Sequence, residues 1–201
     1  MFDTALTLSD MAFLAKGAAI TLAITGISVL FGTILGVAFG TLKTQVSALA
    51  AAPLTFVLDV LRSVPLLIQL ILANAFQSIV GFGWSPFAVS CVVLSLYTSS
   101  YCSEIVRAGI EAVPTVTRRA GRSLGLSWRQ DMTHIVFPMA LRVALPGWIG
   151  LTLGVMKDSA LVLWLGIIEL LRSSQILVTR LQEPLFILIA PVTIRDRKSV
   201  V

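Results

Sequence analysis

Two long stretches without a charged residue constrain this chain more than any other feature of its sequence. The first runs from Gly17 to Leu42 (26 residues) and the second from Ser63 to Ser103 (41 residues). A helix needs roughly 20 apolar residues to cross the hydrocarbon core of a bilayer. The first stretch is therefore long enough for one crossing and the second for two. The sequence predicts an all-α membrane protein.

The composition agrees with this prediction. The chain is 57% hydrophobic and 12% charged, whereas soluble domains have about 45–50% apolar and about 25% charged residues. A soluble fold of 201 residues would leave too much of this apolar surface in water. The net charge of +5 does not indicate nucleic acid, because the cations lie beside the apolar stretches, where they set membrane topology. Membrane lipid is the expected surrounding, and no nucleic-acid partner is expected.

Turn signals divide the chain into about five expected spanning helices. Gly81–Pro86 supplies a turn within the second stretch, which places spans near Val64–Val80 and Pro86–Ile105. A further helix is expected to begin near Pro138, because the first turn of a helix tolerates proline. The last apolar segment, Pro184–Ile194, has 11 residues and is too short to cross. We therefore expect the last span to be truncated.

Three glycines in the first stretch share one helix face. Gly32, Gly36 and Gly40 recur every four residues. Small residues at this spacing let the backbone of a second helix approach closely. The alternative is the ordinary tolerance of membrane helices for glycine.

The lysines and arginines indicate how the helices are oriented. Eight are expected on the side reached after the first and third spans: Lys43, Arg62, Arg107, Arg118, Arg119, Arg122, Arg129 and Arg142. Four are expected on or toward the other side: Lys16, Lys157, Arg172 and Arg180. Cytoplasmic loops carry an excess of Lys and Arg. We therefore expect the eight-cation side in the cytoplasm and the amino terminus outside.

A polar segment from Val113 to Pro138 separates the third and fourth expected spans. Pro114 can open a helix, and Gly125 fits its end, where a left-handed backbone is needed. Ser127 and Gln130 have the spacing of a capping box that starts a second short helix. An apolar stripe is expected along the two helices: Val116, Ala120, Leu124 and Trp128. A helix lying on anionic lipid is one explanation, but two helices with a defined break favour docking into a protein groove.

This polar segment resembles the signature loop of the permease subunits of bacterial ATP-binding-cassette (ABC) importers. The family pattern is Glu-Ala-Ala, three residues, Gly, nine residues, Ile, one residue, Leu-Pro. Here Arg119-Ala120-Gly121, Gly125, Ile135 and Phe137-Pro138 stand at those places. Arg119 reverses the charge of the family's acid, which changes the expected ion pairs at the ATPase contact. Gly121 is expected to weaken the helix by up to about 1 kcal/mol.

Four further segments, in order along the chain, are similar to polar amino-acid permeases of the histidine, glutamine, glutamate and arginine type. They are Gly17–Leu22, Leu61–Gln69, Tyr101–Pro114 and Lys157–Leu161. The resemblance implies a type I ABC importer transmembrane domain over residues 1–194, with a cytoplasmic coupling loop at 113–138. It also implies a permease subunit that translocates polar amino acids across the bacterial inner membrane.

The resemblance further implies which partners the chain has. Members of the family work with a second permease subunit, identical or paralogous, a cytoplasmic ATPase dimer and a periplasmic or lipid-anchored solute-binding protein. ATP and Mg²⁺ are expected on the ATPase, because this chain carries no phosphate-binding loop. Residues 115–133 would lie in a cleft of the ATPase. The implied coupling residues are Arg119, Ala120, Gly121, Leu124, Gly125, Ile135 and Pro138.

Four polar residues near the expected spans are candidates for the substrate path. Asp158 suits the ammonium group of a zwitterion and Lys157 its carboxylate, although the two side chains could equally pair with each other or cap a helix break. Glu169 is a further candidate, and Gln69 could line the path or bond a neighbouring helix. Glu104 and Arg107, three residues apart, are expected to form an ion pair.

The sequence gives no indication of an enzyme or a metal site. The spacing of Cys91 and Cys102 fits neither zinc nor a redox pair. His134, the only histidine, is expected in a loop, and no nucleophile–base set stands out. Two alternatives to the main interpretation stay open. One is a permease for another small solute such as an opine, and the other is a non-transporting membrane anchor that recruits a cytoplasmic partner.

The carboxyl-terminal residues 195–201 are expected to be a non-native tail. The chain turns polar at Arg195, and the codons that spell Asp196–Val201 and a stop can match a common sequencing-adapter string. A genuine short tail is the alternative.

Overall fold

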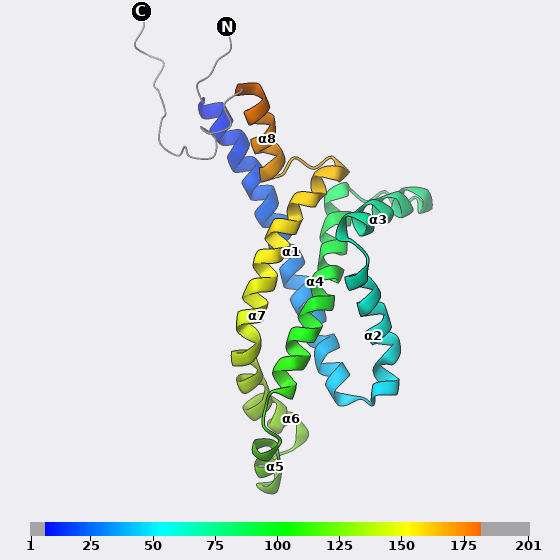
Figure 1. Cartoon of the computed structure of the whole chain (residues 1–201), viewed down its shortest axis with the longest axis vertical. Helices are drawn as coiled ribbons and strands as arrows, with labels where there is room; N and C mark the ends of the chain where they lie inside the picture. Colours follow the sequence, from blue (N-terminus) through cyan, green and yellow to red (C-terminus); the bar gives the residue numbers. More distant parts are fainter. Residues whose placement is uncertain (1–6, 182–201) are drawn as a thin grey trace, which may run out of the picture.

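The computed structural model describes residues 7–181, and this part of the chain is helical apart from short connections (Figure 1). The α-helices are α1 (Leu8–Gln45), α2 (Ala48–Ser63), α3 (Leu66–Val80), α4 (Pro86–Glu111), α5 (Thr115–Ser123), α6 (Trp128–Gln130), α7 (Phe137–Asp158) and α8 (Leu170–Leu181). A π-helix (Asp131–Val136) joins α6 to α7, and a 3-10 helix (Ser159–Leu165) follows α7. The predicted all-α class is confirmed. The expected short last span, Pro184–Ile194, and the expected tail lie outside the described residues.

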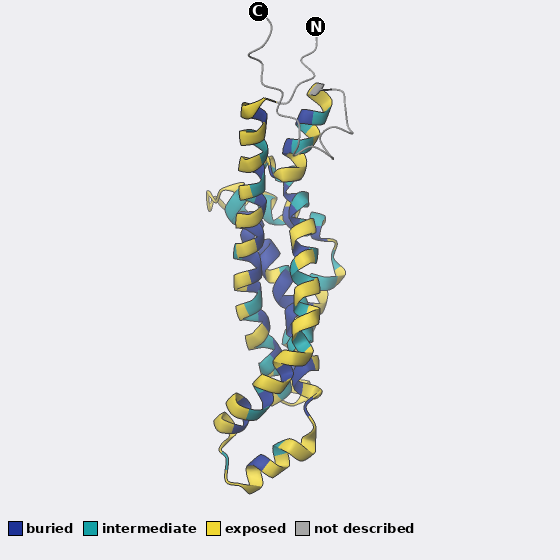
Figure 2. Cartoon of the chain, turned by 90° about the vertical axis from the view of Figure 1, so that its left-hand side faces the viewer, coloured by how far each residue is buried: buried dark blue, intermediate teal, exposed yellow. Residues whose placement is uncertain are grey.

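Three helical segments among the described residues are long and apolar enough to cross a membrane: Leu8–Gln45, Pro86–Glu111 and Trp128–Leu165. They run side by side as a bundle, in which α1, α4 and α7 all contact one another. Figure 2 shows buried positions on the inner sides of these helices and exposed positions on their outer sides. Most of the exposed side chains are apolar, which suits a protein solvated by lipid.

The closest contact in the bundle joins the glycine face of α1 to α4. A Cβ placed on Gly36 would lie 2.5 Å from Cβ of Cys102, and one on Gly40 would lie 2.5 Å from the carbonyl oxygen of Ser103. A Cβ on Gly32 would lie 2.5 Å from Cβ of Thr98. Any side chain at these positions would push the helices apart. The predicted close approach is therefore confirmed, and α4 is the helix that makes it.

The hydroxyl side chains of α4 do not prevent its burial. Each donates a hydrogen bond to a carbonyl oxygen three or four residues earlier in the same helix, which satisfies the hydroxyl without a partner from outside. The hydroxyl residues that do so are Ser90, Ser95, Thr98, Ser99, Ser100 and Ser103. Because these side chains are short, they also allow the backbone of α1 to approach α4 closely.

The span expected near Val64–Val80 differs in the structure. The chain forms two helices here, α2 and α3, which are bent by 105° at a short break and qualify as one crossing only when taken together. The break falls at Pro65, because proline has no N–H to continue the helical ladder. Gln69 Nε2 donates to the carbonyl oxygens of Leu61 (2.7 Å) and Val64 (2.8 Å), which the break leaves free.

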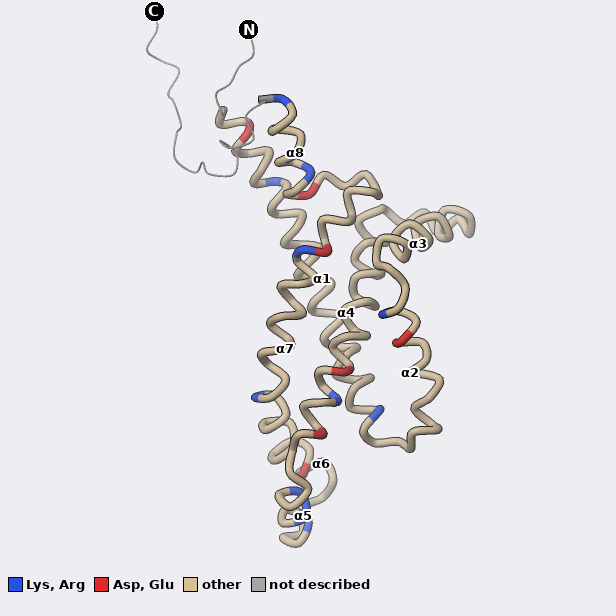
Figure 3. The backbone as a smooth tube through the Cα atoms, viewed as in Figure 1, with Lys and Arg blue, Asp and Glu red and all other residues tan. Residues whose placement is uncertain are grey.

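An ion-pair network centred on Glu104 joins α1, α2 and α4 toward one end of the bundle, where Figure 3 shows charges of both signs gathered. Glu104 accepts from Lys43 of α1 and from Arg107, whose Nη2 lies 2.8 Å away, and Nη1 of Arg62 lies 3.6 Å from it. The predicted pair of Glu104 with Arg107 is confirmed. The Lys43 side chain is only 6% exposed. Glu104 is therefore its counterion inside the bundle, and a buried cation without a counterion would be costly.

We predict that Gly36→Ala destabilises the protein by about 1–3 kcal/mol, because the added methyl group overpacks the α1–α4 contact. Gly26→Ala is the matched control, since a Cβ on Gly26 of the same helix would meet nothing within 4 Å. Thermal unfolding of the purified protein in detergent measures both. Equal melting temperatures for the two variants would contradict the role given to Gly36.

We also predict that Glu104→Gln lowers the free energy of unfolding by about 1–3 kcal/mol, because it leaves the buried Lys43 ammonium without a charged partner. Glu111→Gln removes a more exposed carboxylate (56% exposed) that pairs with the same Arg107, and it should cost at most about 1 kcal/mol. Chemical denaturation followed by tryptophan fluorescence compares the two. The network would be unimportant if the two variants unfolded at the same denaturant concentration.

Candidate functional site

The polar segment, residues 113–138, forms a compact unit at the end of the bundle opposite the amino-terminal end of α1 (Figure 1), and we call it the α5 unit. α5 begins directly after Pro114, and Gly125 follows it with φ of +81°, a conformation that favours glycine. The Ser127 hydroxyl accepts from the Gln130 N–H, and the Gln130 side chain accepts from the Ser127 N–H. The predicted helix start, left-handed glycine and capping box are all confirmed.

α5 presents apolar side chains to the outside. Leu124 is 85% exposed and Val116 is 74% exposed, with exposed Ala120 between them. Trp128, the fourth member of the predicted stripe, is half-exposed, and its Nε1 donates to Oε1 of Gln45 at the end of α1 (2.9 Å). The free part of the stripe is therefore Val116, Ala120 and Leu124, which we call the α5 stripe.

The opposite side of α5 packs against the π-helix. A Cβ on buried Gly121 would lie 2.6 Å from Cδ1 of Ile135 and 3.1 Å from Cδ1 of Leu126. The sequence predicted only that Gly121 weakens the helix. The structure adds that this glycine leaves room for the Ile135 side chain. Two of the predicted coupling residues are thus in direct contact, and Arg119 lies exposed on α5.

Asp131 is a residue of this unit that the sequence analysis did not identify. Its side chain is fully buried, its Oδ2 accepts from Arg118 Nε (3.3 Å), and Arg122 Nη2 lies 4.0 Å away. Its Oδ1 is buried with no hydrogen-bond partner among the described residues. The sequence does contain a signal for this residue: Asp131 is the only acidic residue between Glu111 and Asp158, in a segment rich in arginine that could pair with it. The carboxylate ties α5 to the π-helix, so the α5 stripe is held in a set orientation.

The residues before α7 are helical, which corrects the loop expected around His134. His134 lies exposed in the π-helix, and its Nδ1 is 3.0 Å from the carbonyl oxygen of Gln130. Pro138 lies in the first turn of α7, as predicted. In residues 7–181 no three Cys, His, Asp or Glu side chains are close enough together to hold a metal ion.

Lys157 and Asp158 close α7, where the chain tightens into the 3-10 helix. Lys157 is exposed and Asp158 is half-buried. No ion pair joins either of them to another side chain within residues 7–181. The 3-10 helix continues α7 directly, so no break in the helix follows Asp158. The alternative in which the two side chains pair with each other is not seen either.

The other two path candidates have local hydrogen-bond partners. Gln69 bonds the end of α2, as described above. Glu169 is 2% exposed, and its carboxylate accepts from the N–H groups of Leu171 (2.8 Å) and Arg172 (2.7 Å) at the start of α8. Thr21 of α1 also donates to it, at 3.4 Å. Glu169 therefore caps α8 and joins it to α1.

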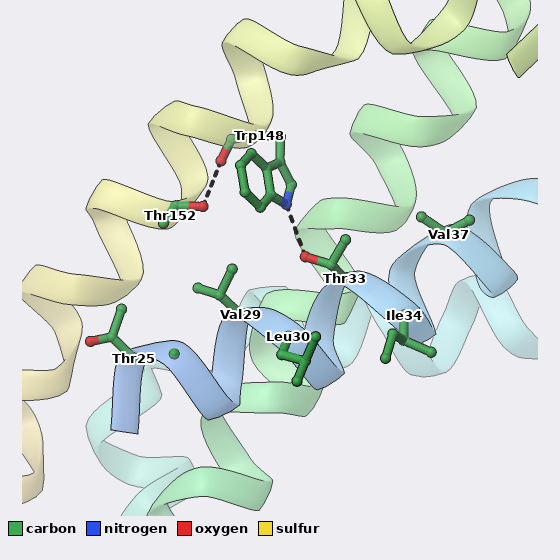
Figure 4. Close-up of a pocket in the computed structure, with 9 residues that line it drawn as sticks. Thr25, Val29, Leu30, Thr33, Ile34, Val37, Trp148 and Thr152 are labelled. Atoms are coloured by element: carbon green, nitrogen blue, oxygen red, sulfur yellow. Dashed lines mark hydrogen bonds between the residues drawn. The ribbon is translucent and has the colours of Figure 1, made fainter. Parts of the chain in front are cut away.

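A groove between α1 and α7 carries hydroxyl groups on an otherwise apolar wall (Figure 4). Its volume is about 610 Å³. Trp148 Nε1 donates to Thr33 (2.9 Å), and Thr152 donates to the carbonyl oxygen of Trp148 (3.0 Å). The bond from Trp148 to Thr33 holds α7 level with the middle of α1, whereas the Thr152 bond lies within α7. The Thr25 hydroxyl on the same wall is buried without a partner among the described residues.

The fold resembles solved ABC importers. A crystal structure of an amino acid ABC transporter with histidines matches with a TM-score of 0.77 and 27% identity, over 89% of this chain and 84% of that chain. The MetNI methionine ABC transporter in inward-facing conformations matches with a TM-score of 0.66, over 78% of this chain and 76% of that chain. At 24% identity the second match supports the fold alone.

Curated relatives match most of the chain. The probable amino-acid ABC transporter permease protein YckA of Bacillus subtilis is 29% identical over 88% of this chain and 78% of its own length. The arginine transport system permease protein ArtQ of the same organism is 30% identical over 85% and 78%. The putative glutamine transport system permease protein GlnP of Rickettsia felis is 31% identical over 82% and 76%. The family described as binding-protein-dependent transport system inner membrane component matches residues 28–193. The chain belongs to this family, and its helices form the transmembrane domain of a type I ABC importer.

Proposed function

We propose that this chain is the permease subunit of an ABC importer that carries polar amino acids across the bacterial inner membrane. The relatives named for arginine and glutamine, and the solved amino acid transporter, support the substrate class. The observation that carries the mechanism is the α5 stripe, which is exposed at one end of the bundle and held from behind by Asp131 and Ile135. A non-transporting anchor would not require the similarity along the whole chain.

In this proposal the α5 stripe binds in a cleft of a cytoplasmic ATPase, which holds ATP and Mg²⁺. Leu124 would enter an apolar pocket of that cleft, and Arg119 would meet its rim. The unit continues without interruption from α6 through the π-helix into α7 and the 3-10 helix, over Trp128–Leu165. A push on α5 is therefore passed along one helical rod to Lys157 and Asp158.

The distribution of cations supports a cytoplasmic α5 and an outside amino terminus. Lys43, Arg62 and Arg107 surround Glu104 at the α5 end of the bundle. At the other end, Arg180 of α8 pairs with Asp10 near the start of α1. The excess of arginines in the α5 unit then follows the positive-inside rule. A solute-binding protein would deliver substrate to the α8 end.

Lys157 and Asp158 are the charged groups that we propose for the substrate path. Unpaired charges within a span usually face a water-filled path or a partner. An amino acid carries one cation and one anion, so its ammonium suits Asp158 and its carboxylate suits Lys157. Gln69 and Glu169 would contribute to the path indirectly, by holding the α2–α3 break and the start of α8 in place.

The transport proposal predicts ATP-dependent uptake in proteoliposomes that contain this chain, its second permease subunit and the ATPase and binding protein encoded beside it. Radiolabelled glutamine, arginine, histidine and an opine are compared. Uptake of one or more of the amino acids supports the proposal. Uptake of the opine alone would show that the substrate class is opines and not polar amino acids. Uptake of none of the four, with ATP hydrolysis stimulated by the loaded binding protein, would also reject polar amino acids.

The docking surface is tested by crosslinking in the same vesicles. We predict that Leu124→Cys is captured by a bifunctional maleimide together with the ATPase. Phe82→Cys is the control, because Phe82 is also well exposed (59%). Phe82 lies just before the start of α4 and α5 lies just after its end, so the two are at opposite ends of the bundle. The native Cys91 and Cys102 are buried and give the background. The docking role is wrong if Phe82→Cys captures the ATPase as readily as Leu124→Cys does.

A further inference from the structure

The hollow in Figure 4 is one part of a longer groove between α1 and α7. It follows α1 from Thr25 to Val37. A second hollow of about 310 Å³ continues it along α7 to Leu141 and shares three lining residues with it: Thr33, Val37 and Trp148. We call the two hollows together the α1–α7 groove. Its walls are largely apolar, which favours hydrocarbon over a polar solute.

The α1–α7 groove lies within the depth of the membrane. Lys16 and Lys43 are 27 residues apart on α1, or about 40 Å at a rise of ~1.5 Å per residue. A hydrocarbon core is roughly 30 Å thick, and lysine side chains extend from its edges toward the headgroups. A core centred between the two lysines therefore begins about 5 Å inside the level of each.

The mouth of the groove is at the edge of this core on the α5 side. Trp148 is level with Thr33, to which it is hydrogen-bonded. Leu141 is seven residues earlier in α7, which runs antiparallel to α1, so it lies about 10 Å closer to α5 (Figure 1). This places Leu141 about 5 Å inside the level of Lys43. From there to Thr25 the groove is about 22 Å long, which exceeds the roughly 15 Å of hydrocarbon in one leaflet.

The groove is too narrow for a helix to lie inside it. Thr25 and Val37 are 12 residues apart, or about 18 Å. Over that length the 610 Å³ of the larger hollow gives a mean width of about 6 Å. An α-helix with its side chains is about 10–12 Å wide, whereas carbon atoms in contact are about 3.5–4.0 Å apart. A single hydrocarbon chain therefore fits. Gly26 contributes to this room, since a Cβ there would meet nothing within 4 Å.

A cation stands at the mouth of the groove. Arg142, the neighbour of Leu141, is exposed and forms no ion pair within residues 7–181. Lys43, at a similar level on α1, is by contrast paired with Glu104. At the edge of the core the guanidinium of Arg142 can extend to the level of the lipid phosphates. Such a cation attracts anionic lipid headgroups.

We infer that the α1–α7 groove binds one acyl chain of an anionic phospholipid from the leaflet on the α5 side, with the lipid phosphate on Arg142. The narrow apolar groove selects a hydrocarbon chain, and the cation at its mouth selects a negative headgroup. The bound chain adds contacts between two helices that the bond from Trp148 to Thr33 already joins. The inference goes beyond the proposed function and does not depend on which solute is transported.

Trp148 lines the groove and can report what occupies it. The other three tryptophans of the full chain are removed by Trp84→Phe, Trp128→Phe and Trp164→Phe. The Trp148 emission is then measured in phosphatidylcholine vesicles that contain a small, fixed fraction of lipid with brominated acyl chains, because bromine quenches tryptophan on contact. Brominated phosphatidylglycerol should bind about fivefold more tightly than brominated phosphatidylcholine, since it alone carries a net negative charge.

Two variants in this background test the two parts of the site. Arg142→Gln should abolish the preference for phosphatidylglycerol and leave quenching by phosphatidylcholine unchanged. Gly26→Leu should lower quenching by both lipids severalfold, because its side chain occupies the groove. Gly150→Leu is the matched control: a Cβ on Gly150 also meets nothing within 4 Å, but Gly150 does not line the groove.

Four results would overturn the inference. Equal quenching by the two lipids before any further substitution indicates contact with bulk lipid only. A preference that survives Arg142→Gln removes the headgroup contact, and equal effects of Gly26→Leu and Gly150→Leu remove the acyl chain from the groove. Quenching by neither lipid indicates that a helix of this chain or of another copy covers the groove. Circular dichroism checks that each variant folds, and Arg142→Gln, which replaces an exposed side chain, decides the headgroup contact even where Gly26→Leu reduces folding.

Discussion

The contact between the glycine face of α1 and the hydroxyl-rich face of α4 is the interaction on which the other parts of the structure depend. Lipid offers no hydrophobic drive for two apolar helices to associate, so the drive has to come from close packing. Gly36 and Gly40 permit that packing, and the serines of α4 allow it because they bond their own backbone. With α4 held in place, α7 packs against it as well, where Gly109 closely approaches the Ala140 carbonyl. The α5 unit, which links α4 to α7, is thereby fixed at both ends.

The long helices α1, α4 and α7 could be predicted from uncharged stretches and turn residues, whereas α2 could not. A search for long uncharged stretches misses α2, because Asp59 and Arg62 lie in the last turns of that helix. Arg62 pairs with Asp59 and lies near Glu104, so its charge has partners inside the protein. A sequence shows a charge but does not show the partner that another helix supplies. The break after α2 has a local cause, Pro65, but its angle of 105° also depends on how α2 and α3 pack against α4.

In the α5 unit too, some features are determined by neighbouring residues and others by residues distant in the sequence. Pro114, Gly125 and the Ser127–Gln130 capping box act within a few residues of themselves, and each could be predicted correctly from its neighbours. Asp131 acts across 13 residues on Arg118, and its burial depends on how α5 folds back over the π-helix. From the sequence alone, Gly121 is expected only to weaken a helix. In the structure its missing side chain is what lets Ile135 lie beneath α5.

The continuity of the helical rod from Trp128 to Leu165 limits how such a transporter can move. Trp128 is hydrogen-bonded to the end of α1, whereas the Trp148 indole bonds Thr33 in the middle of the same helix. The rod is therefore attached to α1 at two levels, through α6 and through α7, and cannot slide along it without breaking one bond. Most of the remaining freedom is rotation of α1, α4 and α7 together as one body. A displacement of α5 at one end then becomes a displacement of Lys157 and Asp158 toward the other, with no flexible joint needed between them.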